Sequence, residues 1–138
     1  QDIYYFTFVN SNTDLNERTG RHTPNSNMSF IIRSNARIIG MKKAYYLDGS
    51  ETDSTWFEND GIVNKVSMYG PTTGINGPDL ISNYSSTELL IPGQWYTVND
   101  TIKMDHRRMI GHGTSKEDYK MLLNIYSNHL DLIKSLPK

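Results

Sequence analysis

Asp60 and His106 are the residues whose types and spacing best suit chemistry. Asp60 lies in the run Asn59-Asp60-Gly61, a turn composition that can present a carboxylate from a loop, and His106 follows 46 residues later. A carboxylate can orient an imidazole and stabilise its protonated form, and the imidazole can then take the proton of a hydroxyl nucleophile. The sequence therefore predicts two members of a nucleophile, base and acid triad.

The third member, a serine in a Gly-x-Ser-x-Gly turn, has no counterpart in the sequence. Ser115 comes nearest, because Gly113 lies two positions before it, but Glu117 stands two positions after it. In α/β-hydrolases the triad follows the order nucleophile, acid, histidine. Because the acid and the histidine occur here in that order, we expect the nucleophile on an N-terminal part of the enzyme, upstream of this chain.

Composition sets the class of protein. The chain has 138 residues, which we assign as residues 1–138 of a single domain, and a net charge of −1, which argues against a nucleic-acid or membrane-surface partner. No apolar run reaches the roughly 20 residues that span a bilayer. Cysteine is absent, which excludes disulfides and thiolate catalysis and fits either a reducing cytosol or a bacterial secreted enzyme. The N-terminal residues show no secretion signal.

Two segments are typical of strands. Residues 3–9 are nearly all β-branched or aromatic, which predicts a strand buried on both faces of a parallel sheet, and residues 95–102 predict a second strand. Residues 10–27 are polar and are interpreted as a long irregular excursion. A short apolar element is predicted over 62–68, and the glycines and prolines of 70–78 predict a loop.

Two segments favour helices. Residues 28–39 predict a short one, with Phe30, Ile31, Ile38 and Ile39 as its apolar residues. The C-terminal helix is predicted from an N-cap at Ser115, with Asp118 three residues on, to an end marked by Pro137. Its apolar stripe recurs at helical spacing through Tyr119, Leu122, Tyr126, His129 and Ile133. Two strands and two helices cannot cover both faces of a parallel sheet, so the fold also predicts a missing partner part.

The run from Trp56 to Pro71 (WFENDGIVNKVSMYGP) resembles the acid-bearing segment of the large bacterial lipases of staphylococci and thermophilic bacilli. Further pieces follow in the family's order, at residues 4–8, 19–20, 24–28, 92–95, 105–106 and 110–111. The resemblance spans almost the whole chain and is weakest at 41–55 and 74–88. It implies that this chain is the C-terminal part of an α/β-hydrolase, an α/β fold that contributes the last strands of a mostly parallel sheet and its covering helices.

By that similarity Asp60 is the triad acid and His106 the base of a carboxylic ester hydrolase. The implied substrate is a lipid ester, with triacylglycerol the first choice, and the implied enzyme is secreted. The chain alone is expected to be inactive, because its partner, the N-terminal hydrolase part, would carry the serine. Lipase and simple esterase are not separable on these residues.

The sequence departs from the family at its calcium site. The resemblance implies acidic ligands two and seven positions after the histidine, where Arg108 and Gly113 stand. A guanidinium cannot ligate a hard cation, so we expect the calcium site to be lost and no metal or other cofactor to bind. One hypothesis is that Arg108 tethers the histidine loop through a salt bridge instead, which requires a melting temperature independent of calcium.

Plainer interpretations stay open beside these. Asn-Asp-Gly is also a common turn, and His112 is a rival for the base. His129 is interpreted as a packed helix residue, His22 as a solvated loop residue and Asp105 as a loop-shaping residue. The competing function is a non-catalytic, degenerate hydrolase remnant that acts as a binding module.

Overall fold

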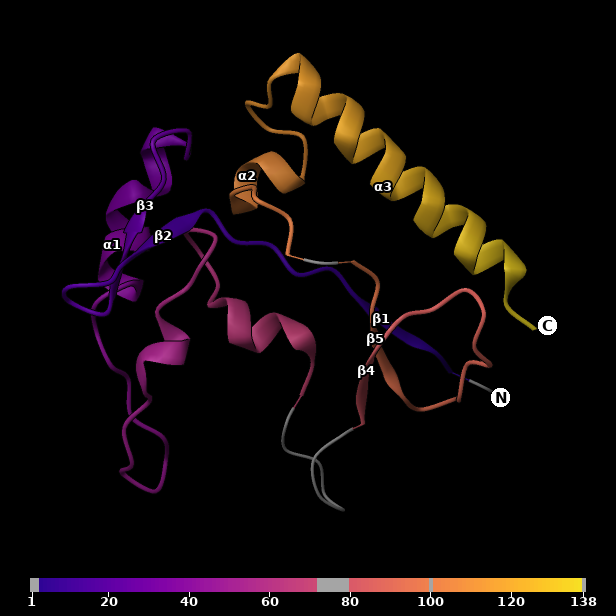
Figure 1. Ribbon diagram of the computed structural model, residues 1–138, viewed down its shortest axis with the longest axis horizontal. Helices are drawn as coiled ribbons and strands as arrows, with labels where there is room; N and C mark the ends of the chain where they lie inside the picture. The colour runs from indigo at the N-terminus through magenta and orange to yellow at the C-terminus, as the bar shows by residue number, and fades with distance from the viewer. Residues whose placement is uncertain (1–2, 72–79, 100, 138) are drawn as a thin grey trace. The chain divides into compact units, whose positions relative to one another are not determined.

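The computed structural model describes residues 3–71, 80–99 and 101–137. The chain divides into two compact units, Gln1–His106 and Arg107–Lys138. Figure 1 shows the elements of each unit along the chain. The first unit holds every strand of the described residues, and the second holds the long C-terminal helix.

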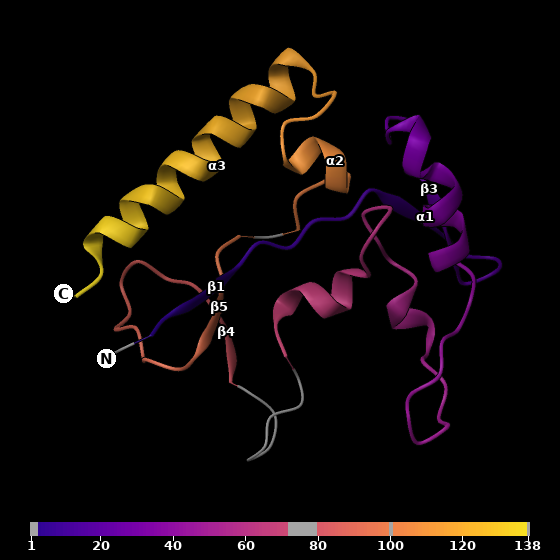
Figure 2. The same cartoon turned by 180° about the vertical axis from the view of Figure 1, so that it is seen from behind.

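The first unit is built on a three-stranded parallel sheet. Its strands are β1 (Tyr5–Thr7), β4 (Ile81–Asn83) and β5 (Trp95–Thr97), in the spatial order β1-β5-β4. Trp95 aligns with both Tyr5 and Ile81, so the central strand pairs with two segments far apart in sequence (Figure 2). A parallel sheet that occurs together with helices makes this an α/β fold, as the sequence predicts.

The strands differ from their predicted bounds. Residues 3–9 and 95–102 form regular strands only over three residues each. Beyond them the two segments still run alongside, because Ile102 donates its backbone N–H to the Val9 carbonyl at 2.8 Å. The prediction that 3–9 is buried on both faces is wrong for Tyr5, which is 36% exposed. Strand β4 was not expected from the sequence.

A hairpin occupies part of the segment predicted to be irregular. Strands β2 (Thr13–Asn16) and β3 (Arg21–Pro24) pair in antiparallel register, so that part of the prediction for 10–27 is wrong. The intervening turn closes with Gly20 donating to the Asn16 carbonyl at 2.8 Å, and Gly20 has a φ of 67°. Most of the hairpin is exposed, so its strands lack the apolar alternation that would have revealed them.

The helix predicted at 28–39 is present, but it buries a different face. A 3₁₀ turn, η1 (Phe30–Ile32), precedes α1 (Arg33–Ile39). The core consists of Met28, Ile32 and Ala36, which lie four residues apart, whereas Phe30 and Ile31 are 85% and 70% exposed. The buried residues recur at every fourth position, so the helix buries the face that carries Met28, Ile32 and Ala36, and the predicted apolar stripe is wrong.

Two further 3₁₀ helices lie in the middle of the chain, η2 (Ser54–Trp56) and η3 (Lys65–Tyr69). The apolar element predicted over 62–68 therefore consists of a turn followed by η3. Of the loop predicted over 70–78, only Gly70 and Pro71 belong to the described residues, and the remainder lies outside them.

The C-terminal unit is helical. Helix α2 (His106–Met109) begins at the last residue of the first unit, and α3 (Lys116–Ser135) follows. The predicted cap is confirmed, because Ser115 Oγ accepts from the Asp118 N–H at 3.1 Å. The stripe is only partly right: Leu122 is buried, but so is Leu132, while Tyr119, Tyr126 and Ile133 are about half exposed. Within the part of the chain that the structure describes, no helix is long and apolar enough to cross a membrane.

Candidate functional site

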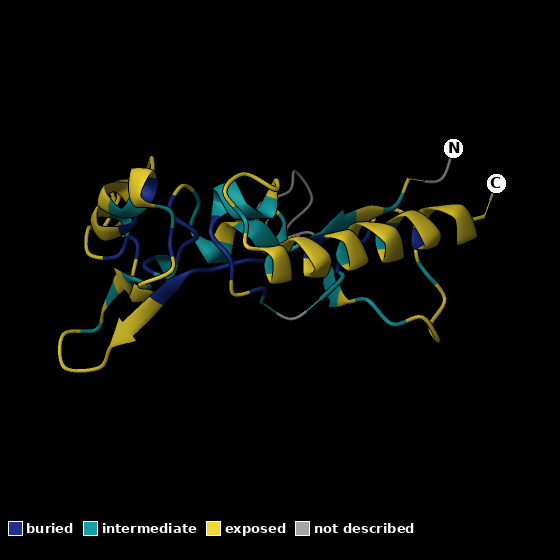
Figure 3. Cartoon of the chain, turned by 90° about the horizontal axis from the view of Figure 1, so that it is seen from above, coloured by how far each residue is buried: buried dark blue, intermediate teal, exposed yellow. Residues whose placement is uncertain are grey.

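A short buried segment, residues 9–13, lies at the centre of the first unit. It is polar except for Val9, and each of its residues is at most 6% exposed (Figure 3). On one side Ser11 donates its backbone N–H to the Ile102 carbonyl at 2.9 Å, and on the other Asn12 donates to the Asn59 carbonyl at 3.0 Å. This segment therefore joins the chain before Asp60 to the chain before His106.

The Asp60 carboxylate is fully buried and receives hydrogen bonds on both oxygens. Oδ1 accepts from the backbone N–H groups of Ile62 at 2.9 Å and Val63 at 2.8 Å. Oδ2 accepts from Asn10 Nδ2 at 3.1 Å and contacts His106 Nδ1 at 2.9 Å. The side chain is 0% exposed. A buried carboxylate held by several donors is fixed in position.

His106 is attached to Asp60 at two points. Its ring Nδ1 lies 2.9 Å from Asp60 Oδ2, and its backbone N–H donates to the Asp60 carbonyl at 3.0 Å. Because a carboxylate only accepts, the Nδ1 nitrogen carries the proton, and Nε2 is left as the nitrogen that can accept one in the neutral ring. The side chain is 43% exposed while its partner is fully buried. The two residues that the sequence singled out are therefore in direct contact.

Gly61 allows the turn that presents Asp60. Its φ of 99° lies in the left-handed region that favours glycine. A Cβ atom there would stand 2.6 Å from Ile32 Cδ1, in the core of the unit. The Asp60 loop thus packs directly against Ile32, and a Cβ atom at this position would force the Ile32 side chain to move.

The other histidines and the neighbouring acid lie elsewhere. Asp105 is fully buried, and its Oδ2 accepts from the Ser29 N–H at 2.7 Å, which fixes the loop before His106. His112 belongs to the second unit, where its ring contacts Arg107 Nη2 at 3.0 Å. His129 lies on α3 and is half-buried.

His22 is not the solvated loop residue that was predicted. It lies on β3, half-buried, with Nδ1 3.2 Å from Thr13 Oγ1. Burial lowers the pKa of its imidazole below the ordinary value of 6.5, the Glu58 carboxylate raises the pKa, and the ammonium groups of Lys103 and Lys65 lower it, with a smaller opposing effect of Asp14. Glu58 is itself paired with Lys65 at 2.9 Å, and these side chains line a pocket together with His22.

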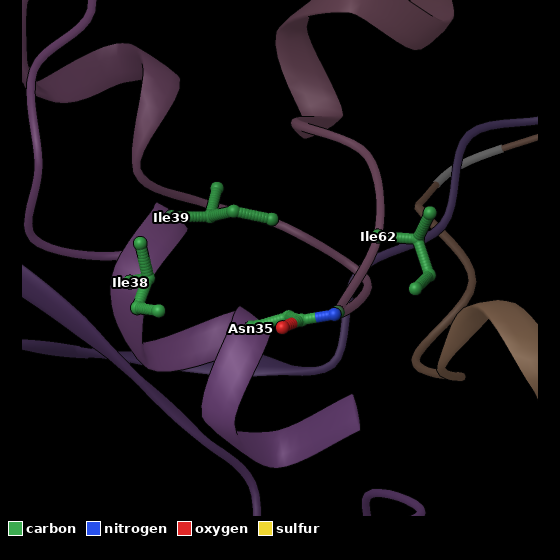
Figure 4. A pocket seen from close by; sticks show the side chains of 5 residues that line it. Asn35, Ile38, Ile39 and Ile62 are labelled. Carbon is green, nitrogen blue, oxygen red and sulfur yellow. The ribbon is translucent and has the colours of Figure 1, made fainter. Parts of the chain in front are cut away.

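A second pocket borders the Asp60 loop. It has a volume of about 240 Å³ and is lined by Asn35, Ile38, Ile39, Gly61 and Ile62. Figure 4 shows the α1 side chains on one side of it and Ile62 on the other. Its walls are mainly aliphatic. Two of its lining residues, Gly61 and Ile62, directly follow Asp60 in the chain.

The two positions where the resemblance implies calcium ligands are occupied by Arg108 and Gly113. The Arg108 guanidinium is 11% exposed and forms an ion pair with Asp118 Oδ2, and Gly113 has no carboxylate. Among residues 3–71, 80–99 and 101–137, no group of three or more His, Cys, Asp or Glu side chains is placed to hold a metal ion. The donor set thus disagrees with calcium at this place.

Sequence reasoning missed Asn10. It is the first residue of the segment 10–27, which was interpreted as an irregular polar excursion, and one asparagine there is not distinguished from its neighbours. Its role depends on Asp60, 50 positions away, and no local pattern reports such a contact.

No family model matches the chain. Three solved structures resemble it closely in fold. EstA from Clostridium botulinum has a TM-score of 0.70 and 30% identity over 88% of this chain, and Staphylococcus hyicus lipase has a TM-score of 0.72 and 26% identity over 95%. Lipase 1 from Pelosinus fermentans, at 24% identity over 99% of the chain and a TM-score of 0.70, shows the fold.

This chain spans only 29% of the EstA structure, 30% of the S. hyicus lipase and 34% of the Pelosinus lipase. The chain therefore corresponds to about a third of the length of each of these proteins. The neighbours thus confirm what the sequence predicts: the chain resembles the C-terminal part of bacterial lipases.

Proposed function

We propose that this chain supplies the acid and the base of a serine carboxylic ester hydrolase whose nucleophile lies on a part outside residues 1–138. Asp60 is the acid and His106 the base, and the chain is the C-terminal portion of an α/β-hydrolase. The observation that carries the proposal is the contact between the buried Asp60 carboxylate and His106 Nδ1 at 2.9 Å. The likeness to solved lipases and an esterase supports the reaction class.

The chemistry follows from that contact. His106 Nε2 takes the proton of the serine hydroxyl as the hydroxyl attacks the ester carbonyl, and then returns it to the leaving alcohol. Asp60 keeps Nδ1 protonated, so that Nε2 is the basic nitrogen, and stabilises the imidazolium while it exists. Water then attacks the acyl-enzyme. His106 takes a proton from the water and returns it to the serine oxygen as the carboxylic acid leaves. The oxyanion hole belongs to the proposed N-terminal part.

The proposed substrate is a lipid ester, with triacylglycerol as the first choice. The complete enzyme is proposed to be secreted. We propose no metal or other cofactor, because Arg108 is paired with Asp118 where a calcium ligand would have to stand. The Arg108–Asp118 pair would instead tie α2 to the first turn of α3.

A fluorescent fluorophosphonate probe tests the proposal. The protein that contains this chain should be labelled, and peptide mapping should place the label on a serine outside residues 1–138. The variants Asp60→Ala and His106→Ala should both prevent labelling, and His112→Ala should retain it. A folded protein that takes no label, or a label on a serine of this chain, contradicts the proposal and favours the non-catalytic remnant or a different site.

A further inference from the structure

One buried amide holds both catalytic segments. Asn10, which is 6% exposed, donates from Nδ2 to Asp60 Oδ2 at 3.1 Å and to the Met104 carbonyl at 3.0 Å. Met104 lies two residues before His106 and is itself fully buried. A single side chain thus contacts the acid directly and the peptide that leads to the base.

Within the described part of the chain, Asn10 is one of two groups that hold the Oδ2 atom of the Asp60 carboxylate. A carboxylate has about four lone-pair sites. Two backbone N–H groups bind Oδ1, so Oδ2 is shared by His106 Nδ1 and Asn10 Nδ2 alone among the described residues. Without Asn10, Oδ2 would be held only by the imidazole that it must orient. The Oδ2 atom could then shift together with the ring, and the orientation of the imidazole would no longer be fixed.

The backbone around Asn10 is well fixed, so its amide has little freedom. Asn10 forms a parallel bridge with Ile102, and the neighbouring Ser11 N–H binds the Ile102 carbonyl at 2.9 Å. The amide therefore approaches Asp60 from a backbone that lies three residues after the end of β1 and is hydrogen-bonded to Ile102. A donor held in place in this way costs no reorganisation when charge develops on the imidazole.

We infer that Asn10 is a positioning residue that sets the orientation of the Asp60–His106 pair. The inference rests on the proposed function. Asn10 touches neither substrate nor nucleophile and acts through Oδ2 of Asp60. Its loss should slow the chemical step and leave substrate binding unchanged, because the pair matters most when the imidazole becomes charged.

Asn10→Leu tests this, with Asn12→Leu as the matched control. Asn12 is equally buried, at 2% exposed, and its Nδ2 donates to Asn27 Oδ1 at 2.9 Å, away from Asp60. In the complete enzyme we expect Asn10→Leu to lower kcat by about 10- to 100-fold with KM unchanged, which is the size of effect found for residues that orient metal ligands through hydrogen bonds. Asn12→Leu should lose similar stability and keep kcat. Asn10→Ser, whose hydroxyl is too short to reach both acceptors, is used if the leucine variant does not fold.

Proton NMR adds a readout that needs no catalysis. The hydrogen-bonded Nδ1–H of His106 should give a far-downfield resonance in the parent protein, assigned by its loss in His106→Ala. That resonance should move or broaden in the Asn10 variant and stay in place in Asn12→Leu.

The outcomes separate this inference from the proposed function. A low kcat with an altered Nδ1–H resonance supports it. If the Asn10 variant is as active as Asn12→Leu while Asp60→Ala is inactive, the positioning role is overturned and the triad stands. If Asp60→Ala and His106→Ala keep full activity, the proposed function itself fails, and the inference fails with it.

Discussion

Replacing Asp60 by asparagine tests the chemistry of the pair most sharply. The change keeps the size of the side chain, and the amide oxygen can still accept from Ile62 and Val63 as Oδ1 does. The amide nitrogen would then face His106 Nδ1 and the Asn10 donor, which both offer hydrogens. To avoid two opposed donors the ring must carry its proton on Nε2, where it cannot accept one from serine.

The geometry sets the size of the effect. A carboxylate and an imidazolium 2.9 Å apart attract by about 6 kcal/mol at an effective dielectric constant of about 20. Because the His106 side chain is 43% exposed, solvent screening reduces this to about 3–5 kcal/mol. At about 1.36 kcal/mol per tenfold change in rate, kcat should fall by about 10²- to 10⁴-fold.

The assay is steady-state hydrolysis of a soluble p-nitrophenyl ester by the complete enzyme, with the folded fraction checked by circular dichroism. Asp105→Asn is the matched control, since Asp105 is also fully buried and precedes His106, but its carboxylate binds the Ser29 N–H. We expect that control to lose less than about tenfold in kcat. If Asp60→Asn also loses less than about tenfold, or if the control loses as much, then Asp60 is not the acid and the reasoning is refuted.

Three further predictions concern stability. Gly61→Ala should lower the free energy of unfolding in urea by about 1–3 kcal/mol more than Gly49→Ala, because both have positive φ but only Gly61 is blocked by a core side chain. Because burial lowers the pKa of His22, the unfolded state binds more protons than the folded state. The contribution of His22 to the free energy of unfolding should therefore fall as the pH drops below about 6.5 and stay constant above it. Denaturation midpoints that depend equally on pH in His22→Gln would contradict this. The melting temperature should be the same in calcium and in EDTA. A double-mutant cycle of Arg108→Gln and Asp118→Asn should give a coupling free energy of about 1–3 kcal/mol. Stabilisation by calcium, or the absence of coupling, would refute the idea that this ion pair replaces calcium.

The sequence predicted what depends on local signals. The long C-terminal helix follows from the Ser115 cap and apolar spacing, and the cap hydrogen bond is present. Asp60 and His106 follow from residue type, chain order and resemblance, and the structure places them in contact. Their catalytic roles stay predictions, as does the missing N-terminal part.

The sequence could not predict what depends on distant partners. The β2–β3 hairpin is mostly exposed and carries no alternation, and β4 is only three residues long. The buried face of the 28–39 helix was misassigned because two faces of that segment carry apolar residues, and the one that packs is the face of Met28, Ile32 and Ala36. Asn10 was missed because its importance arises from a contact with Asp60, which no single-residue propensity encodes.

The double attachment of His106 to Asp60 has a mechanical consequence. Since one hydrogen bond joins the backbones and another joins the side chains, sliding either loop past the other would break both together. The distance between Asp60 and His106 is thus set by two bonds at once. Under the proposed function, the alignment that these bonds leave open is the gap between His106 Nε2 and the proposed serine. Mutations selected for faster turnover should therefore gather where that gap is set, and leave the Asp60–His106 pair unchanged.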